Sequence, residues 1–148
     1  MADNARQIQI ELGGATAVAR LLDDKAPIAC QKLWDALPID GAARHSRWSG
    51  GAAYVLVDAL RDATYCGAQH PQLNLPENFN SFLRIGTVNY VAAHGELVLC
   101  YDQAQVRAAD GNQWAARVAD IQGDPSPLFG ALALTQHRGQ TPIRITRL

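Results

Sequence analysis

Arg47 is the side chain whose type and position point most directly to chemistry. It lies beside Trp48 in residues 42–48, which we predict to be a strand. A guanidinium stays protonated in proteins, so an inward-pointing Arg47 needs an anionic or carbonyl partner. It would then hold a substrate carboxylate or stabilise the charge that develops on a carbonyl oxygen. The alternative is a structural or surface ion pair.

Glu77 and Asn78 lie in a second segment with chemical potential, residues 58–84, which is rich in Asn, Pro, Gln and Gly. A loop of this length in a compact domain is often functional. If the loop closes over a pocket, Glu77 is suited to activate water as a general base, and Asn78 to contact the substrate. The alternative is that both are solvated loop residues.

Five further residues complete the predicted site. His45, two positions before Arg47, is grouped with Arg47 and Glu77 as catalytic. Trp48 and Tyr54 would supply apolar walls for a flat substrate. Glu96 faces either the mouth of the fold or water, and Asn112 is either a substrate contact or a turn residue.

The sequence carries no metal-binding motif. Cys66 and His70 have a Cys-x3-His spacing, but a zinc site needs three or four ligands and no second pair is near in sequence. A nucleophile pair of Cys66 with His70 or His45 is an alternative, as is an inert thiol. We expect no metal and no cofactor.

The elements that must position these residues begin with a hairpin. Residues 7–12 alternate polar and apolar, Gly13-Gly14 follow, and residues 16–22 are a second predicted strand. A helix begins near Pro27, since proline suits the first turn, and ends at Pro38 and Gly41. The apolar face predicted to reach the core consists of Cys30, Leu33, Trp34 and Leu37.

Short strands dominate the rest of the chain. They are predicted at residues 42–48, 52–57, 86–91, 96–100, 105–108 and 115–121, with a closing strand at 142–148. A second helix at 127–137 has Leu128, Ala131, Leu132 and Thr135 on one face and Gly139 after it. This order predicts one mainly β domain over residues 1–148, a closed antiparallel barrel of about eight strands capped by two helices. Residues 143–148 should pair near the N-terminal hairpin.

Composition limits the classes of partner. The 148 residues are 48% hydrophobic with a net charge of -1, which excludes a disordered body and a polyanion-binding protein. Three cysteines argue against a disulfide framework, and neither a transmembrane run nor a signal-peptide core is visible. We expect a cytoplasmic protein with a small-molecule substrate, no nucleic acid and no membrane; a homo-oligomer is compatible with this sequence.

Two adjoining motifs resemble a known superfamily. The run Ala26-Pro-Ile-Ala-Cys-Gln-Lys-Leu-Trp-Asp-Ala-Leu-Pro38 precedes Arg44-His-Ser-Arg-Trp-Ser-Gly50. Together with Pro76-Glu-Asn78, Gly95-Glu-Leu-Val-Leu99 and Gly111-Asn-Gln-Trp-Ala115, they resemble the cyclophilin-like superfamily, most closely a bacterial group of single-domain proteins of unknown function. The resemblance covers most of residues 6–123 and implies the barrel fold.

The resemblance also implies a role for one residue. In cyclophilins that are prolyl isomerases, the matching strand carries an arginine that polarises the prolyl amide, and Arg47 stands in the corresponding place. The Gln-Gly-Gly-Asp and Phe-Phe-Ile segments of those isomerases are absent. We therefore expect a small-molecule enzyme, a hydrolase of an amide-like or cyclic C–N bond. A prolyl isomerase and a non-catalytic module that binds a small ligand or a partner are the alternatives.

Overall fold

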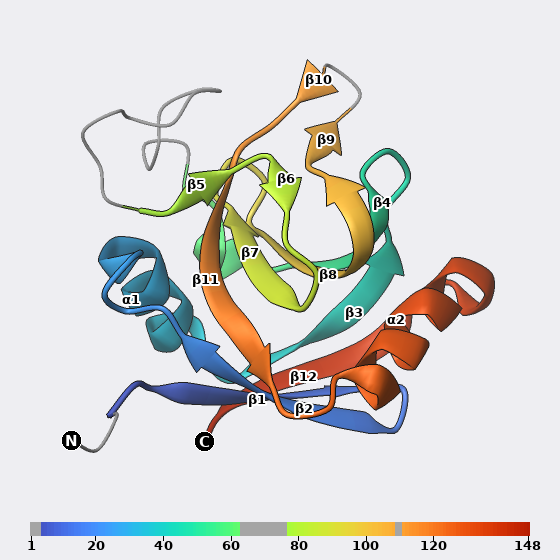
Figure 1. Cartoon of the computed structure of the whole chain (residues 1–148), viewed down its shortest axis with the longest axis horizontal. Coiled ribbons are helices and arrows are strands. Elements are labelled where there is room, and N and C mark those ends of the chain that lie inside the picture. The colour runs from blue at the N-terminus through green and yellow to red at the C-terminus, as the bar shows by residue number, and fades with distance from the viewer. Residues whose placement is uncertain (1–3, 63–76, 109–110) are drawn as a thin grey trace.

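The first and last strands of the chain lie side by side in the wall of one barrel (Figure 1). The computed structural model describes residues 4–62, 77–108 and 111–148. β1 (Gln7–Leu12) pairs antiparallel with β12 (Thr141–Arg147), as the sequence predicts. Ile8, Ile10 and Leu12 of β1 are buried, because alternate side chains of a strand point to the same face.

A two-residue turn connects β1 to β2 (Ala15–Leu21). Gly13 and Gly14 have φ angles of 56° and 81°, a left-handed conformation at both positions that glycine adopts without steric cost. Positive φ at both central residues matches the right-handed twist of the flanking strands. The predicted hairpin is confirmed.

Eight strands form a closed antiparallel barrel, in the order β2-β1-β12-β3-β4-β8-β7-β11. The strands not yet named are β3 (Ile39–His45), β4 (Gly50–Leu56), β7 (Thr87–Val91), β8 (Glu96–Gln105) and β11 (Ala115–Gln122). β11 closes the ring by pairing with β2, where Ala119 stands opposite Leu21. The predicted mainly β barrel with two helices is confirmed.

The two helices, α1 (Pro27–Ala36) and α2 (Ser126–Arg138), lie on different sides of the barrel (Figure 1). Each buries one face in the main apolar core, α1 through Ala29, Cys30 and Leu33 and α2 through Leu128 and Leu132. None of the described helices has the length and apolar character needed to cross a membrane.

Trp34, expected in the core, is only partly buried. Its ring packs against the core edge, and the guanidinium groups of Arg6 and Arg147 lie over it at 5.0 and 4.9 Å from the ring centre. A cation over an aromatic face is attracted by the ring quadrupole, so these contacts stabilise a tryptophan that is still in contact with water.

Several element boundaries differ from the predicted ones. β3 ends at His45, so that residues 46–49 form a turn and Trp48 is not in a strand. The stretch predicted as a long loop contains a short 3-10 helix, η1 (Asp58–Leu60), and two two-residue strands, β5 (Phe79–Asn80) and β6 (Phe82–Leu83). β8 runs on to Gln105, and β9 (Arg107–Ala108) pairs with β10 (Gly111–Asn112) as a separate hairpin.

Apolar side chains gather on both faces of the wall formed by β4, β7 and β8. Leu97 and Leu99 of β8 point into the main core, whereas Val98 and Cys100 belong to a second apolar cluster. Since side chains alternate along a strand, the second cluster lies on the outer face of the barrel. The candidate site is built on this outer face.

Candidate functional site

A hollow of about 180 Å³ lies on the outer face of the barrel, beside the second apolar cluster. Its lining comes from the turn after β3, from β4 and β8, and from the β9–β10 region. The residues that line it are Ser46, Arg47, Trp48, Ser49, Tyr54, His94, Glu96, Val98, Val106, Arg107 and Gln113. We call it the Arg47–Glu96 pocket.

The turn of residues 46–49 is fixed by hydrogen bonds at both of its ends. The Ser46 hydroxyl accepts from the Ser49 backbone N–H (2.9 Å), which closes the turn. The Ser49 carbonyl accepts from the Gln105 N–H (2.8 Å), and the Ser49 hydroxyl from the Arg107 N–H (3.1 Å). The arginine and the tryptophan between the two serines are therefore presented from backbone that is bonded to β8 and its continuation.

Two arginines line the pocket. Arg47 is exposed and makes no hydrogen bond or ion pair with any described residue. Arg107 is also exposed, and its guanidinium donates to the Gln105 side-chain oxygen at 2.9 Å. An unpaired guanidinium at a pocket wall is available to a carboxylate or carbonyl oxygen of a ligand.

Glu96 begins β8 and is partly buried in the same pocket. Burial raises the pKa of its carboxyl above the ordinary value, and the nearby His94 opposes this by a smaller amount. Within the described part of the chain its carboxylate has no hydrogen-bond partner. A partly buried carboxyl with a raised pKa is a candidate general acid or base.

His94 and Gln113 stand together at the pocket wall, with 3.1 Å between the His94 Nε2 and the Gln113 Nε2. Because an amide nitrogen only donates, in the neutral form of the ring this His94 nitrogen accepts and the ring proton is on Nδ1. The Gln113 backbone N–H donates to the Val106 carbonyl at 2.9 Å, which fastens this side of the pocket to its apolar floor.

The floor of the pocket is apolar. Val98 and Val106 are buried and line it, and the partly buried Tyr54 packs against the same cluster. Trp48, which is 56% exposed, forms part of the rim. The arrangement suits a small ligand with an apolar part and at least one anionic or carbonyl oxygen.

Four of the eight predicted site residues meet in this pocket: Arg47, Trp48, Tyr54 and Glu96. The structure places three of the others outside it: His45, Glu77 and Asn78.

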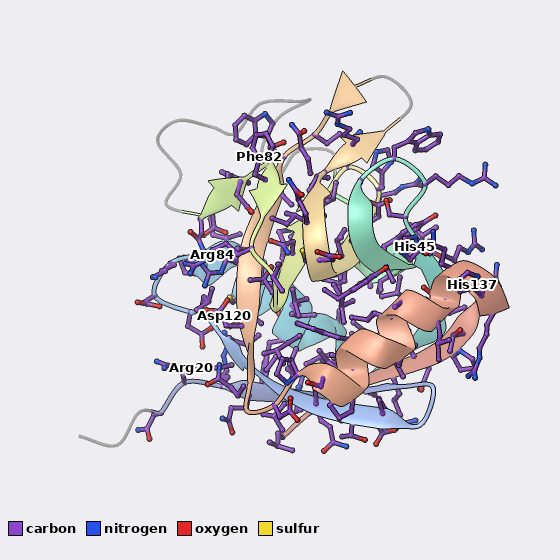
Figure 2. The ribbon with its side chains drawn as sticks, turned by 45° about the vertical axis from the view of Figure 1, so that its right-hand side comes forward. Arg20, His45, Phe82, Arg84, Asp120 and His137 are labelled. Carbon is purple, nitrogen blue, oxygen red and sulfur yellow. The ribbon has the colours of Figure 1, made fainter. Side chains whose placement is uncertain are left out.

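His45 faces another side of the barrel, where α2 packs (Figure 2). Its Nδ1 lies 2.9 Å from the Ser46 carbonyl and its Nε2 2.7 Å from the Tyr101 hydroxyl. A carbonyl only accepts, so in the neutral ring Nδ1 donates and Nε2 accepts from Tyr101. Burial raises the pKa of Tyr101, which keeps its hydroxyl protonated.

Glu77, expected as a general base, lies at the N-terminus of α1. It is fully buried, and its two carboxylate oxygens accept from the backbone N–H groups of Ile28 (3.1 Å) and Ala29 (2.6 Å). The first N–H groups of a helix have no partner within the helix, and a carboxylate there also favours the helix dipole. Glu77 therefore holds a helix end, away from the Arg47–Glu96 pocket.

Asn78 has a backbone role next to Glu77. Its side-chain amide donates to the Arg117 carbonyl (3.2 Å), and its own carbonyl accepts from the Arg117 N–H (3.2 Å). The backbone of Asn112 pairs with Arg107 in the β9–β10 hairpin, whereas its side chain lies outside the described part, as do Cys66 and His70.

His94, Arg107 and Gln113 line the pocket without having been predicted as site residues. Two of them stand close in sequence to a predicted one, since His94 is two residues before Glu96 and Gln113 follows Asn112. The polar turn before the strand at 96–100 was a usable signal for His94. Arg107 had none, because its position depends on how the segment after β8 turns back.

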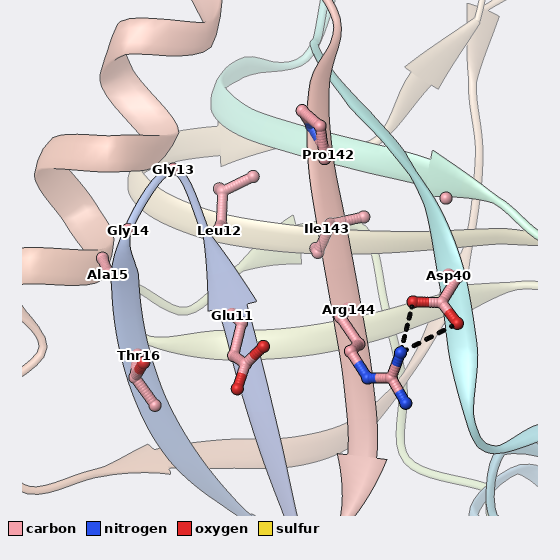
Figure 3. Close-up of a pocket in the computed structure, with 11 residues that line it drawn as sticks. Glu11, Leu12, Gly13, Gly14, Ala15, Thr16, Asp40, Pro142, Ile143 and Arg144 are labelled. Carbon is pink, nitrogen blue, oxygen red and sulfur yellow. Dashed lines mark hydrogen bonds and ion pairs between the residues drawn. The ribbon is translucent and has the colours of Figure 1, made fainter.

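A larger hollow of about 530 Å³ lies over β1, β12 and β3, next to the Gly13-Gly14 turn (Figure 3). Its charged residues already have partners. Arg144 donates to Asp40 at 3.1 Å, and Glu11 accepts from the Gln9 side chain at 2.9 Å. We place the candidate site in the smaller pocket because that is where Arg47 and Glu96 are without partners.

No cluster of three or more His, Cys, Asp or Glu side chains that could hold a metal ion occurs among the described residues. The charged side chains that line the Arg47–Glu96 pocket are two arginines and a glutamate, and a histidine stands beside them. This set is suited to oxygen-bearing organic ligands.

Comparison with protein families gives one match. Residues 8–115, well over half of the chain, match the model of a family described as Protein of unknown function (DUF3830). A comparison with curated proteins finds no match.

Solved structures share the fold. A structure of McbB in complex with tryptophan has a TM-score of 0.71 at 18% identity, over 95% of this chain and 44% of McbB. This chain therefore spans less than half of McbB. The solution structure of the hypothetical protein AF2241 from Archaeoglobus fulgidus has a TM-score of 0.62 at 15% identity, over 100% of both chains.

Proposed function

The chain belongs to the family described as Protein of unknown function (DUF3830), and we propose that it is a small-molecule hydrolase of an amide-like or cyclic C–N bond. One observation carries the proposal. Arg47, which has no partner among the described residues, and Glu96, a half-buried carboxyl with a raised pKa, line the same hollow. Two groups of opposite charge that lack partners and line one small pocket are typical of a site that binds a polar ligand.

Arg47 is the group that polarises the substrate. Its planar guanidinium donates to the carbonyl oxygen of the bond to be broken and stabilises the negative charge that develops there. The resemblance to cyclophilin-like proteins supports this role, because the corresponding arginine of the prolyl isomerases polarises an amide. Arg107, which also lines the pocket, would hold a substrate carboxylate.

Glu96, and not Glu77 as the sequence suggested, is the proposed general base. As a carboxylate it removes a proton from a water molecule, whose oxygen attacks the carbonyl carbon. The C–N bond then breaks, and the proton on Glu96 passes to the leaving nitrogen. One water is consumed, and a carboxylic acid and an amine are formed.

The apolar floor and the tryptophan of the McbB structure guide the choice of substrates. Val98, Val106 and Tyr54 suit the hydrocarbon part of a small acid, and McbB is a barrel relative in fold whose structure contains an aromatic amino acid. We therefore propose N-acyl amino acids, and lactams or cyclic ureides that carry a carboxylate, as the substrate class.

The test is a panel of such compounds incubated with the protein and followed by NMR for the appearance of free amine. We expect at least one compound to be hydrolysed by the wild type. Arg47→Ala and Glu96→Gln should each remove the activity, whereas Gln9→Ala, in a surface position outside the pocket, should not. Binding in the pocket without turnover of any compound would instead support a non-catalytic ligand-binding module.

Prolyl isomerisation is a second candidate, favoured by the buried valines of the pocket floor. An isomerase needs an apolar slot for the proline ring and a cation at the amide; Val98 and Val106 would line the slot, and Arg47 would supply the cation. NMR exchange on a proline-containing peptide separates the two functions. An isomerase would lose its activity in Arg47→Ala and keep it in Glu96→Gln, since no proton is transferred.

A cytoplasmic location is also proposed. Cys30 and Cys100 are free and buried, and burial raises the pKa of their thiols to about 12 and about 11. Such thiols are unreactive, and their unpaired state agrees with a reducing compartment.

A further inference from the structure

A second hollow, of about 250 Å³, adjoins the Arg47–Glu96 pocket. The two share Trp48, Ser49 and Arg107 as lining residues. Beyond this shared wall, the second hollow is lined by Phe82 of β6 and by the end of β8. We call it the Phe82 hollow.

The Phe82 hollow contains the two aromatic side chains with the greatest exposure in the described chain. Phe82 is 74% and Trp48 56% exposed. Phe82 lies at the end of the molecule opposite the β1–β2 hairpin (Figure 2). Large apolar side chains that remain in water side by side mark binding surfaces more often than scattered single ones do.

Both aromatic residues stand on hydrogen-bonded backbone. Phe82 is opposite Gln105 in the β6–β8 pair, and the next residue, Leu83, is buried in the second apolar cluster. The Ser81 carbonyl accepts from the Val106 N–H at 2.8 Å. Trp48 is held by the turn described above. Rings on a fixed backbone lose little conformational freedom when a ligand packs against them.

We infer that the substrate is elongated, and this rests on the proposed function of the adjoining pocket. Its amide and carboxylate occupy the Arg47–Glu96 pocket, and an apolar acyl group, such as an aryl-acyl group, passes Trp48 and packs against Phe82. Arg107 stands at the junction of the two hollows, where the polar part of the substrate meets its apolar arm. The predicted substrate class is thereby narrowed to N-acyl amino acids with a large apolar acyl group.

The test compares two probes, N-acetylglycine and N-(phenylacetyl)glycine, whose dissociation constants are measured by NMR titration of the labelled protein. With the wild type we expect the phenylacetyl probe to bind at least about tenfold more tightly, as an added aromatic contact allows. Phe82→Ala should remove this gain and leave the dissociation constant of N-acetylglycine unchanged. Because Phe82 is largely exposed, we expect the variant to fold normally. A melting temperature equal to that of the wild type would exclude a folding defect.

Ile85→Ala is the matched control, because Ile85 is 57% exposed and lines neither of the two hollows. Ile85→Ala should bind the phenylacetyl probe more tightly than N-acetylglycine by the same factor as the wild type. A gain that survives in Phe82→Ala would overturn the inference. If N-acetylglycine binds in an Arg47-dependent manner and the phenylacetyl probe binds no better, the inference fails while the proposed function stands. If neither probe binds at Arg47 and neither is hydrolysed, both fail.

Discussion

The carboxylate of Glu77 accepts a 2.6 Å hydrogen bond from the backbone N–H of Ala29, 48 positions earlier in the chain. A residue of the segment 58–84 thus completes the first turn of α1. Because α1 has no side-chain cap of its own, this contact ties the helix to the strand region around β5.

Glu77→Ala should lower the free energy of unfolding by about 1–3 kcal/mol, since it leaves buried helix N–H groups without these acceptors. Glu77→Gln keeps one acceptor oxygen and should have a smaller effect. Urea unfolding measures both changes. Ligand binding in the Arg47–Glu96 pocket should persist in the folded Gln variant. A Gln variant of unchanged stability that has lost turnover would show that Glu77 acts as the base after all.

Glu96 should make stability depend on pH. Burial raises its pKa, so that between the unfolded and folded pKa values the folded protein binds more protons than the unfolded chain. Stability must then fall as the pH rises through this range. Glu96→Gln removes this titration, and the variant should melt at a similar temperature to the wild type at pH 4 and at a higher one at pH 7. Thermal melts across this range test the prediction, and a difference that does not vary with pH would contradict it.

Arg47→Lys should already reduce turnover at least about tenfold, because a compact ammonium cannot reproduce the two parallel donors of a guanidinium. The reaction rate of the best panel substrate is the measurement. Arg44→Lys, three residues earlier and outside the pocket, is the control and should leave the rate unchanged. Equal rates in wild type and Arg47→Lys would mean that only a positive charge is needed there.

Gly51→Ala should destabilise the barrel by about 1–3 kcal/mol, the usual effect of overpacking. An added Cβ would lie 2.3 Å from the Asp102 Cβ and 2.9 Å from its Cα, at the bulge where β4 meets β8. Gly130→Ala is the control, since its added Cβ would meet no atom within 4 Å beyond its own stretch of helix and alanine favours the helix by roughly 1 kcal/mol. Urea unfolding should move the two variants in opposite directions. If Gly51→Ala left the free energy of unfolding unchanged, β8 would have to shift at little energetic cost.

Much of the fold could be predicted because its signals are local. The Gly13-Gly14 turn, the proline that begins α1 and the alternation in β12 each act within a few residues. The position of Trp48 was predicted wrongly, as part of a strand, because the turn that contains it depends on hydrogen bonds to Gln105 and Arg107, more than fifty residues away.

The candidate site could be predicted only in part for the same physical reason. Arg47, Trp48, Tyr54 and Glu96 lie on or beside strands whose alternation is readable. The exchange of Glu77 for Glu96 as the proposed base depends on burial and on a helix end that is distant in sequence. The few residues around each glutamate show neither how deeply its side chain is buried nor which helix end it contacts.

The position of β12 between β1 and β3 has a consequence for synthesis. During synthesis the first three strands leave the ribosome long before residues 141–147. Until β12 is made, β1 and β3 each have one edge without a partner strand. Exposed strand edges invite pairing with other chains, so a nascent chain stalled before residue 141 should be a client of chaperones. The barrel can close only after β12 has left the exit tunnel and paired with both β1 and β3.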